Sequence, residues 1–222
     1  MTALLRYQLE LLLRSHRWLP PLLLYALFLV IGVQSGQPIL DSRGYTAAGL
    51  LPVAAWWVRV CTSGDSPAAR HVAAAATSPA RVQLACVLTA LLCSLGLGVL
   101  ATVVVARISS PHSADHQVAV PVGEATASGL LAALACALLG TAVGALCNWP
   151  LVRRPGWGLL ATALLALLAL VWAASPAYAA AHDLVTGSHS GAVPLPLLPC
   201  LLAARICAAA TARACAAAGR RG

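Results

Sequence analysis

The chain has 222 residues, of which 60% are hydrophobic and only 9% are charged. Soluble domains carry about 25% charged residues, so most of this surface faces lipid, and the length fits one domain. The net charge of +8 comes from arginines at the ends of apolar runs and forms no basic stripe, which argues against a nucleic-acid partner. The sequence therefore predicts an all-α, polytopic membrane protein.

Every basic residue in the chain is arginine, because the sequence contains no lysine. An ATP-binding loop needs glycines that cradle the phosphates and a lysine that reaches them. The chain cannot carry that loop, so we expect it not to be an enzyme and to hold no cofactor of its own. If ATP drives its work, hydrolysis occurs on a partner chain.

Residues 1–17 are predicted to form a cytoplasmic interfacial helix. Four charged residues recur at helical spacing and share one face, while leucines fill most of the remainder. The charged set is Arg6, Glu10, Arg14 and Arg17. Such a helix lies in the headgroup plane with its apolar face toward the acyl chains. A helix that is simply solvated is the alternative.

Six apolar segments follow, within a single predicted transmembrane domain at 18–210. A bilayer core about 30 Å thick is crossed by roughly 20 mostly apolar helical residues. The predicted spans are 18–33, 45–60, 82–106, 125–147, 157–180 and 192–210, and a cytoplasmic tail follows at 211–222. The first two spans are short, and the sixth begins among prolines. Five spans with a re-entrant or interfacial last segment is therefore the alternative.

The distribution of arginines gives the orientation of these spans. Twelve arginines, including Arg153 and Arg154, lie in segments that would share one side with the two termini. Only Arg43 and Arg107 lie in the alternate loops. Because cytoplasmic loops carry the excess of basic residues, both termini are predicted to be cytoplasmic.

The longest inner connection, at 62–81, is predicted to contain a short helix held between two spans. A serine followed by a proline is typical of a helix start, with the serine as cap and the proline in the first turn. This pair occurs twice, before an alanine-rich stretch and again at the start of the third span. The candidate functional residues of this segment are Pro67, Ala68, Arg70, His71, Ser78, Pro79 and Arg81. A simple connecting turn is the alternative.

The fourth predicted span contains the small-residue sequence GTAVG at Gly140–Gly144. Small residues four positions apart let two helix backbones approach closely. Packing within the chain is favoured over contact between two chains.

Polar residues elsewhere offer few sites for chemistry. The outer segments 109–124 and 182–190 hold histidines and aspartates that could together bind zinc or copper. These residues are His112, Asp115, His116, His182, Asp183 and His189. Solvated loop histidines are the favoured interpretation, so no metal is predicted. No acid lies deep in any predicted span, which argues against proton or sodium coupling.

The order of these parts resembles the ABC-2 type permeases, the membrane-spanning subunits of many bacterial ABC exporters. The resemblance covers nearly the whole chain. Its nearest local similarities are the strings AAATSPAR at Ala74–Arg81 and LGTAVG at Leu139–Gly144. The outer loops are shorter and the sixth span is weaker than in the larger members.

The resemblance implies a permease in the bacterial plasma membrane that forms half of an export pathway. It implies an ABC ATPase partner, which carries ATP and magnesium and receives Pro67–Ala76, and a second permease chain, identical or homologous. A secondary carrier, a non-transporting scaffold subunit and a membrane-embedded enzyme using the outer histidines are the alternatives. The apolar spans favour an amphipathic or apolar cargo.

Overall fold

The computed structural model describes residues 1–110, 112, 120–151 and 155–220, and this part of the chain is helical throughout apart from short connections. Its helices are α1 (Thr2–Arg14), α2 (Leu19–Gly32), α3 (Ile39–Gly64), α4 (Pro67–Ala76), α5 (Pro79–Ile108), α6 (Val122–Cys147), α7 (Pro155–Val171), α8 (Pro176–Ser190) and α9 (Leu197–Gly219). An isolated β-bridge joins Pro38 to Ser110. The predicted all-α class is confirmed.

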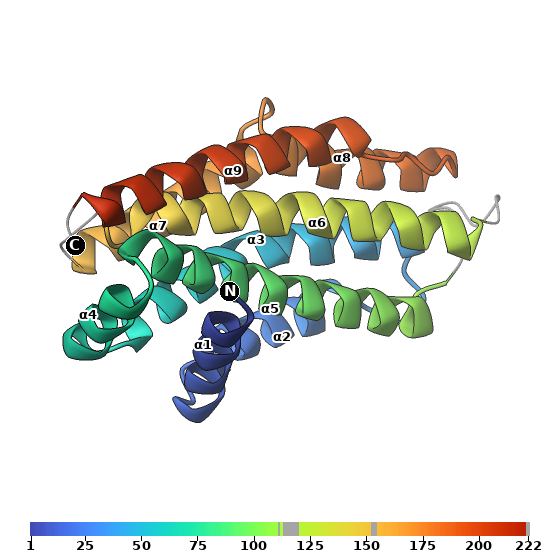
Figure 1. Ribbon diagram of the computed structural model, residues 1–222. Helices are drawn as coiled ribbons and strands as arrows, with labels where there is room; N and C mark the ends of the chain where they lie inside the picture. The colour runs from blue at the N-terminus through green and yellow to red at the C-terminus, as the bar shows by residue number, and fades with distance from the viewer. Residues whose placement is uncertain (111, 113–119, 152–154, 221–222) are drawn as a thin grey trace.

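The long helices α3, α5, α6 and α9 run side by side, and α3 packs against α6 in the middle of the bundle (Figure 1). α3 also contacts α2, α5 and α8. Figure 1 places α4, the start of α5 and the C-terminus at the same end of the bundle. Because Arg59, Arg70 and Arg81 belong to the helices that meet there, we call it the arginine-rich end.

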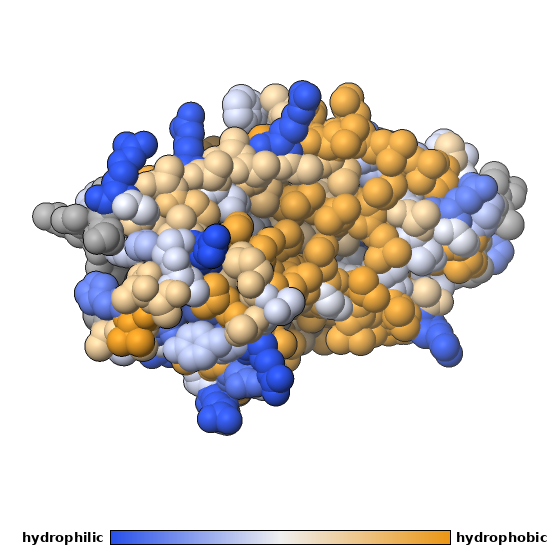
Figure 2. Space-filling model, viewed as in Figure 1, coloured by the Kyte–Doolittle hydropathy of each residue, from blue (hydrophilic) through white to orange (hydrophobic). Residues whose placement is uncertain are grey.

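Within the described residues, α5, α6 and α9 are each long and apolar enough to cross a bilayer. Two bent pairs raise the number to five: α1 with α2, bent by 75°, and α7 with α8, bent by 42°. Figure 2 shows apolar residues gathered over the middle of the visible face. Large side chains such as Leu160 and Leu198 are 65% and 68% exposed, as expected for lipid contact. The chain is a helical membrane protein with three to five candidate spans.

The predicted second span, 45–60, lies inside α3, yet α3 is not among these candidates. α3 includes Asp41, Arg43 and Arg59, which lower its hydropathy. Its neighbours surround it, and residues such as Leu50 and Val58 have no exposed surface. A helix that contacts protein instead of lipid can carry charge at its ends.

The predicted fifth span, 157–180, is wrong as a single helix. α7 ends at Val171, and α8 begins at Pro176 after a short break. Proline has no backbone N–H and clashes with the preceding helical turn, so it begins a helix more easily than it continues one. α8 then covers 182–190, where the sequence predicts a polar loop, and stops at Gly191 with a left-handed φ of 72°.

Helix bounds also differ from prediction at the two termini. α9 begins at Leu197, later than 192, because prolines precede it, and it continues to Gly219 into the predicted tail. α1 ends at Arg14, and His16 has a positive φ of 54°, so Arg17 does not share the helical face predicted for it. α2 agrees with the predicted first span within one residue at each end.

Candidate partner-docking site

The short helix predicted between the second and third spans is present as α4. The Ser66 hydroxyl accepts a hydrogen bond from the Ala69 N–H at 3.2 Å, with Pro67 in the first turn. The same arrangement starts α5, where the Ser78 hydroxyl accepts from the Arg81 N–H at 3.3 Å. Each cap satisfies one of the N–H groups that a helix start leaves unpaired.

A buried carboxylate fixes the corner between α3 and α4. Asp65 is 8% exposed, and its two oxygens accept hydrogen bonds from Gln8 Nε2 at 2.9 Å and from the Tyr7 hydroxyl at 3.3 Å. Burial and the neighbouring Asp65 carboxylate raise the pKa of Tyr7 above its usual 10.0, so the phenol remains a donor. α1 is therefore tied through Asp65 to the base of α4.

Arg70 holds α4 from its other side. Its Nη2 donates to the carbonyl oxygen of Thr62 near the end of α3. The guanidinium carbon lies 4.4 Å from the ring centroid of Trp149, which follows α6. This cation–π distance is within the attractive range. Arg70 thus connects α4 with α3 and with the α6–α7 connection, so it positions the helix and is not its free charged tip.

The outward face of α4 is formed by other residues. Ala68, His71, Val72 and Ala75 are exposed and follow the spacing of one helical face. Val72 is 71% exposed. The face is small and apolar apart from the histidine, and a helix with such a face suits a groove on a partner protein. Arg81, at the start of α5, is also exposed.

Helix α1, which the sequence predicts to be interfacial, packs one side on α5 and α3, with Gln8 and Leu12 buried. Its charged side is exposed, and Arg6 Nε pairs with Glu10 Oε1 at 2.9 Å. Arg14 is exposed at the last turn. Arg17 donates from Nη1 to the Ser63 carbonyl oxygen at 3.0 Å, which adds a second tie between the N-terminal segment and the end of α3.

The glycine stripe lies inside the molecule, between α6 and α3. A Cβ built on Gly140 would lie 2.3 Å from the Leu51 carbonyl oxygen, and one built on Gly144 would lie 2.7 Å from Val58 Cβ. Real Cβ atoms essentially never approach other atoms so closely. The predicted preference for packing within the chain agrees with this contact.

The polar groups of the two segments predicted to lie outside do not assemble into a metal site among the described residues. His182, Asp183 and His189 lie on α8, and no group of three or more metal-ligating side chains occurs in this part of the chain. Asp115 and His116 lie outside the described residues, as do Arg153 and Arg154 of the predicted inner turn.

The loop position predicted for Arg43 is wrong. Arg43 lies in the second turn of α3 and is 1% exposed, because α3 begins before 45. Its Nη2 donates to Thr126 Oγ1 at 2.9 Å, while Nε and Nη1 are buried and have no hydrogen-bond partner among the described residues. Gly129 makes room for its aliphatic stem, since a Cβ there would lie 2.7 Å from Arg43 Cδ.

The sequence reasoning missed the groups that anchor α4. The expected site residues did not include Asp65 and its two donors, Tyr7 and Gln8. They also did not include Trp149, which contacts Arg70. One signal was available: Asp65 is the single acid between the second and third predicted spans, in a segment otherwise rich in arginine.

Comparisons with protein-family models, with curated proteins and with solved structures find no match.

Proposed function

We propose that this chain is the membrane-spanning permease subunit of an ATP-driven exporter and that an ABC ATPase on another chain binds α4. The observation that carries the proposal is a capped helix of ten residues, held near its start by the contacts of Asp65 and Arg70, with an exposed apolar face. A helix held in this way transmits force, because it cannot move independently of the end of α3.

In this proposal the polypeptide crosses the bacterial plasma membrane six times, through α2 together with its flanking residues, α3, α5, α6, the α7–α8 pair and α9. α3 is the crossing that hydropathy misses. Its 26 residues give a length of about 39 Å at 1.5 Å per residue, which exceeds a bilayer core of about 30 Å. Both termini and α4 then lie in the cytoplasm, and α1 lies in the headgroup plane. A second permease chain completes the pathway.

The contacts of α4 define how ATP-driven motion reaches the spans. A partner that displaces α4 pulls on Asp65, which is bonded to α1, and on Arg70, which is bonded to α3. Both connections lead to α3, the helix at the centre of the bundle. Tilting of α3 against α6 and α5 is the expected result, and it would open the pathway to alternate sides of the membrane.

Capture of the ATPase from its native membrane tests this proposal. The tagged full chain is crosslinked in cells, purified in mild detergent and analysed by mass spectrometry for a protein with a lysine-containing ATP-binding loop. Val72→Glu places a charge on the outward face of α4 and should abolish capture. Arg213→Glu is the matched control, since Arg213 is an exposed residue of α9, and it should retain capture.

Two results would count against the proposal. One is the absence of any ATPase from the wild-type crosslinked material, and the other is equal capture by Val72→Glu and the wild type.

Arg70→Glu combined with Pro67→Gly should release α4 from its anchors, so that the ATPase still binds but transport no longer follows ATP hydrolysis.

The break between α7 and α8 favours a second candidate function, a secondary carrier. Carriers use helices interrupted inside the bilayer to bind substrates and ions at the exposed helix ends. The two functions are distinguished by transport in reconstituted vesicles that contain this chain without any ATPase. An exporter subunit is inactive in such vesicles, whereas a carrier is active.

A further inference from the structure

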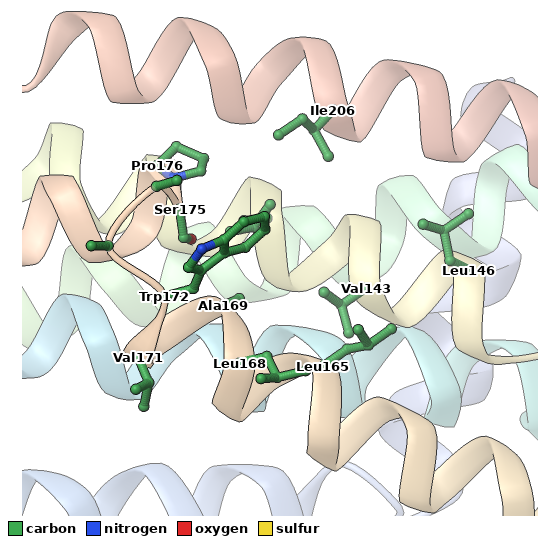
Figure 3. Close-up of a pocket in the computed structure, with 13 residues that line it drawn as sticks. Val143, Leu146, Leu165, Leu168, Ala169, Val171, Trp172, Ser175, Pro176 and Ile206 are labelled. Atoms are coloured by element: carbon green, nitrogen blue, oxygen red, sulfur yellow. The ribbon is translucent and has the colours of Figure 1, made fainter.

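The break between α7 and α8 lies beside an apolar pocket. The pocket has a volume of about 750 Å³ and is lined by α6, α7, the break itself and α9. Figure 3 shows Trp172 extending from the break into the space bounded by Val143, Leu165 and Ile206. Ile206 lies near the middle of α9, so the pocket lies well away from both ends of that helix.

Among the described residues, a single hydroxyl side chain lines this pocket, and it has no hydrogen-bond partner there. Ser175 is 5% exposed, and its hydroxyl makes no hydrogen bond within the structure. Ser175 is the residue before the first turn of α8, but its side chain does not cap that helix, unlike Ser66 and Ser78. A buried hydroxyl without a hydrogen bond is unfavourable, so a ligand that brings an acceptor to this Oγ removes that cost.

The start of α8 strengthens the polar character of this point. The first N–H groups of a helix have no intrahelical acceptor, and the helix start carries partial positive charge. In α8 these groups lie next to Ser175, with Pro176 in the first turn. The break therefore places the Ser175 hydroxyl and the positive end of the α8 dipole beside an otherwise apolar pocket, at a place that water does not reach from the bilayer.

The lining also limits the charge of a ligand. In the described part of the chain, no arginine, histidine or acidic side chain lines the pocket, and an unpaired charge in apolar surroundings is strongly unfavourable. The volume falls within the range of about 300–1,000 Å³ typical of small-molecule sites. Trp172 and Val171 are 68% and 74% exposed, so the pocket opens sideways to the surrounding lipid.

We infer that the α7–α8 break binds an uncharged amphiphile whose apolar body fills this pocket and whose carbonyl oxygen accepts a hydrogen bond from Ser175. The ligand enters from the bilayer. This inference requires the membrane location of the bundle and is independent of any ATPase at α4, so either can fail without the other.

A matched pair of probes tests this site in the full chain, purified and held in lipid nanodiscs. One probe is a long-chain alkyl diazirine that carries a ketone, and the other is the same alkyl diazirine without the ketone. After illumination, mass spectrometry locates the labelled residues, and titration gives the half-saturating concentration. The half-saturating concentration for labelling of the pocket residues should be about 3- to 10-fold lower for the ketone probe than for the probe without the ketone, which is the effect of one neutral hydrogen bond.

Substitutions then assign the preference to Ser175. Ser175→Ala should bring the two probes to equal affinity, and it removes no internal hydrogen bond, so the fold is expected to persist. Ser94→Ala is the control, because Ser94 lies on α5 and bonds to the Ala90 carbonyl oxygen; it should keep the ketone preference. Ala169→Phe fills the pocket and should block labelling by both probes there.

Three outcomes would overturn the inference. Equal labelling by both probes in the wild type would mean that the pocket holds only alkyl chains, such as lipid tails. Ketone preference that persists in Ser175→Ala would place the hydrogen bond elsewhere. Labelling spread evenly along α7 and α9, without concentration at the break, would mean that there is no site.

Discussion

Replacing Gly140 by alanine tests the close contact between α6 and α3. The added Cβ would lie 2.3 Å from the Leu51 carbonyl oxygen and 2.9 Å from Ala54 Cβ. Ordinary van der Waals contacts begin at 3.4 Å. The obstructing atom is part of the α3 backbone and not the end of a flexible side chain. The two helices must therefore separate by about 1 Å, which disturbs packing along the contact.

The expected loss of stability follows from two opposing terms. Overpacking of a tight interior costs about 1–3 kcal/mol, while alanine gains about 1 kcal/mol over glycine in a helix interior. A backbone obstruction lies at the upper end of the first range, so we expect a net loss of about 2 kcal/mol. For a chain of this size that loss lowers Tm by about 4–8 °C. Size-exclusion of the heated protein in detergent, detected by fluorescence, measures this shift.

Gly96→Ala is the matched control for Gly140→Ala. Gly96 also lies within a long helix, α5, but a Cβ built there has nothing within 4 Å. We expect its Tm to equal or exceed that of the wild type, because only the helix-propensity term remains. Gly144→Ala should behave like Gly140→Ala. A Gly140→Ala protein as stable as Gly96→Ala would refute the close approach of α6 to α3.

Two further substitutions examine the two ends of α3. Asp65→Ala leaves Gln8 buried without its acceptor and should lower the free energy of unfolding by about 1–3 kcal/mol. The control is Glu124→Ala, which removes an exposed acid on α6 and should change the free energy of unfolding by less than about 0.5 kcal/mol. Equal Tm values for the two variants would contradict the Asp65 anchor. Arg43→Met replaces a buried guanidinium that has two nitrogens without a hydrogen-bond partner among the described residues, so it should keep or raise Tm. Arg43→Ala leaves a cavity and should lower Tm. A Tm loss as large for methionine as for alanine would refute this reasoning.

Local signals in the sequence predicted the helix starts well. The serine–proline pairs at Ser66 and Ser78 act as caps in the structure, and α4 ends where the sequence predicted. The same pair occurs at Ser175 and Pro176, inside an apolar run long enough to cross a bilayer. There the hydropathy of the run outweighed the local signal, so the α7–α8 break was missed. A proline after serine was the better guide, because it acts on the backbone whatever surrounds it.

Contacts between distant segments could not be predicted. Asp65 gains its role only because Tyr7 and Gln8 approach it across a separation of more than fifty residues in the sequence. Arg70 contacts Trp149 across a still longer separation. Helical periodicity places residues on a face but does not say which helix covers that face. The anchors of α4 depend on that second fact.

The burial pattern of the bundle itself supports lipid as its solvent. Among the four described helices longer than 20 residues, α3 is the least apolar in composition and has the largest share of buried residues. α5 contains the most apolar window of the three candidate spans, yet only half of that window is buried, and in α9 the buried share is 22%. A protein folded in water buries its most apolar helix, because the hydrophobic effect drives that helix inside. In a bilayer that drive is absent, and small residues such as Gly140 and Gly144 select the central helix by close packing. α3 is therefore central because α6 fits against it, and its charged ends are tolerated there because protein covers them.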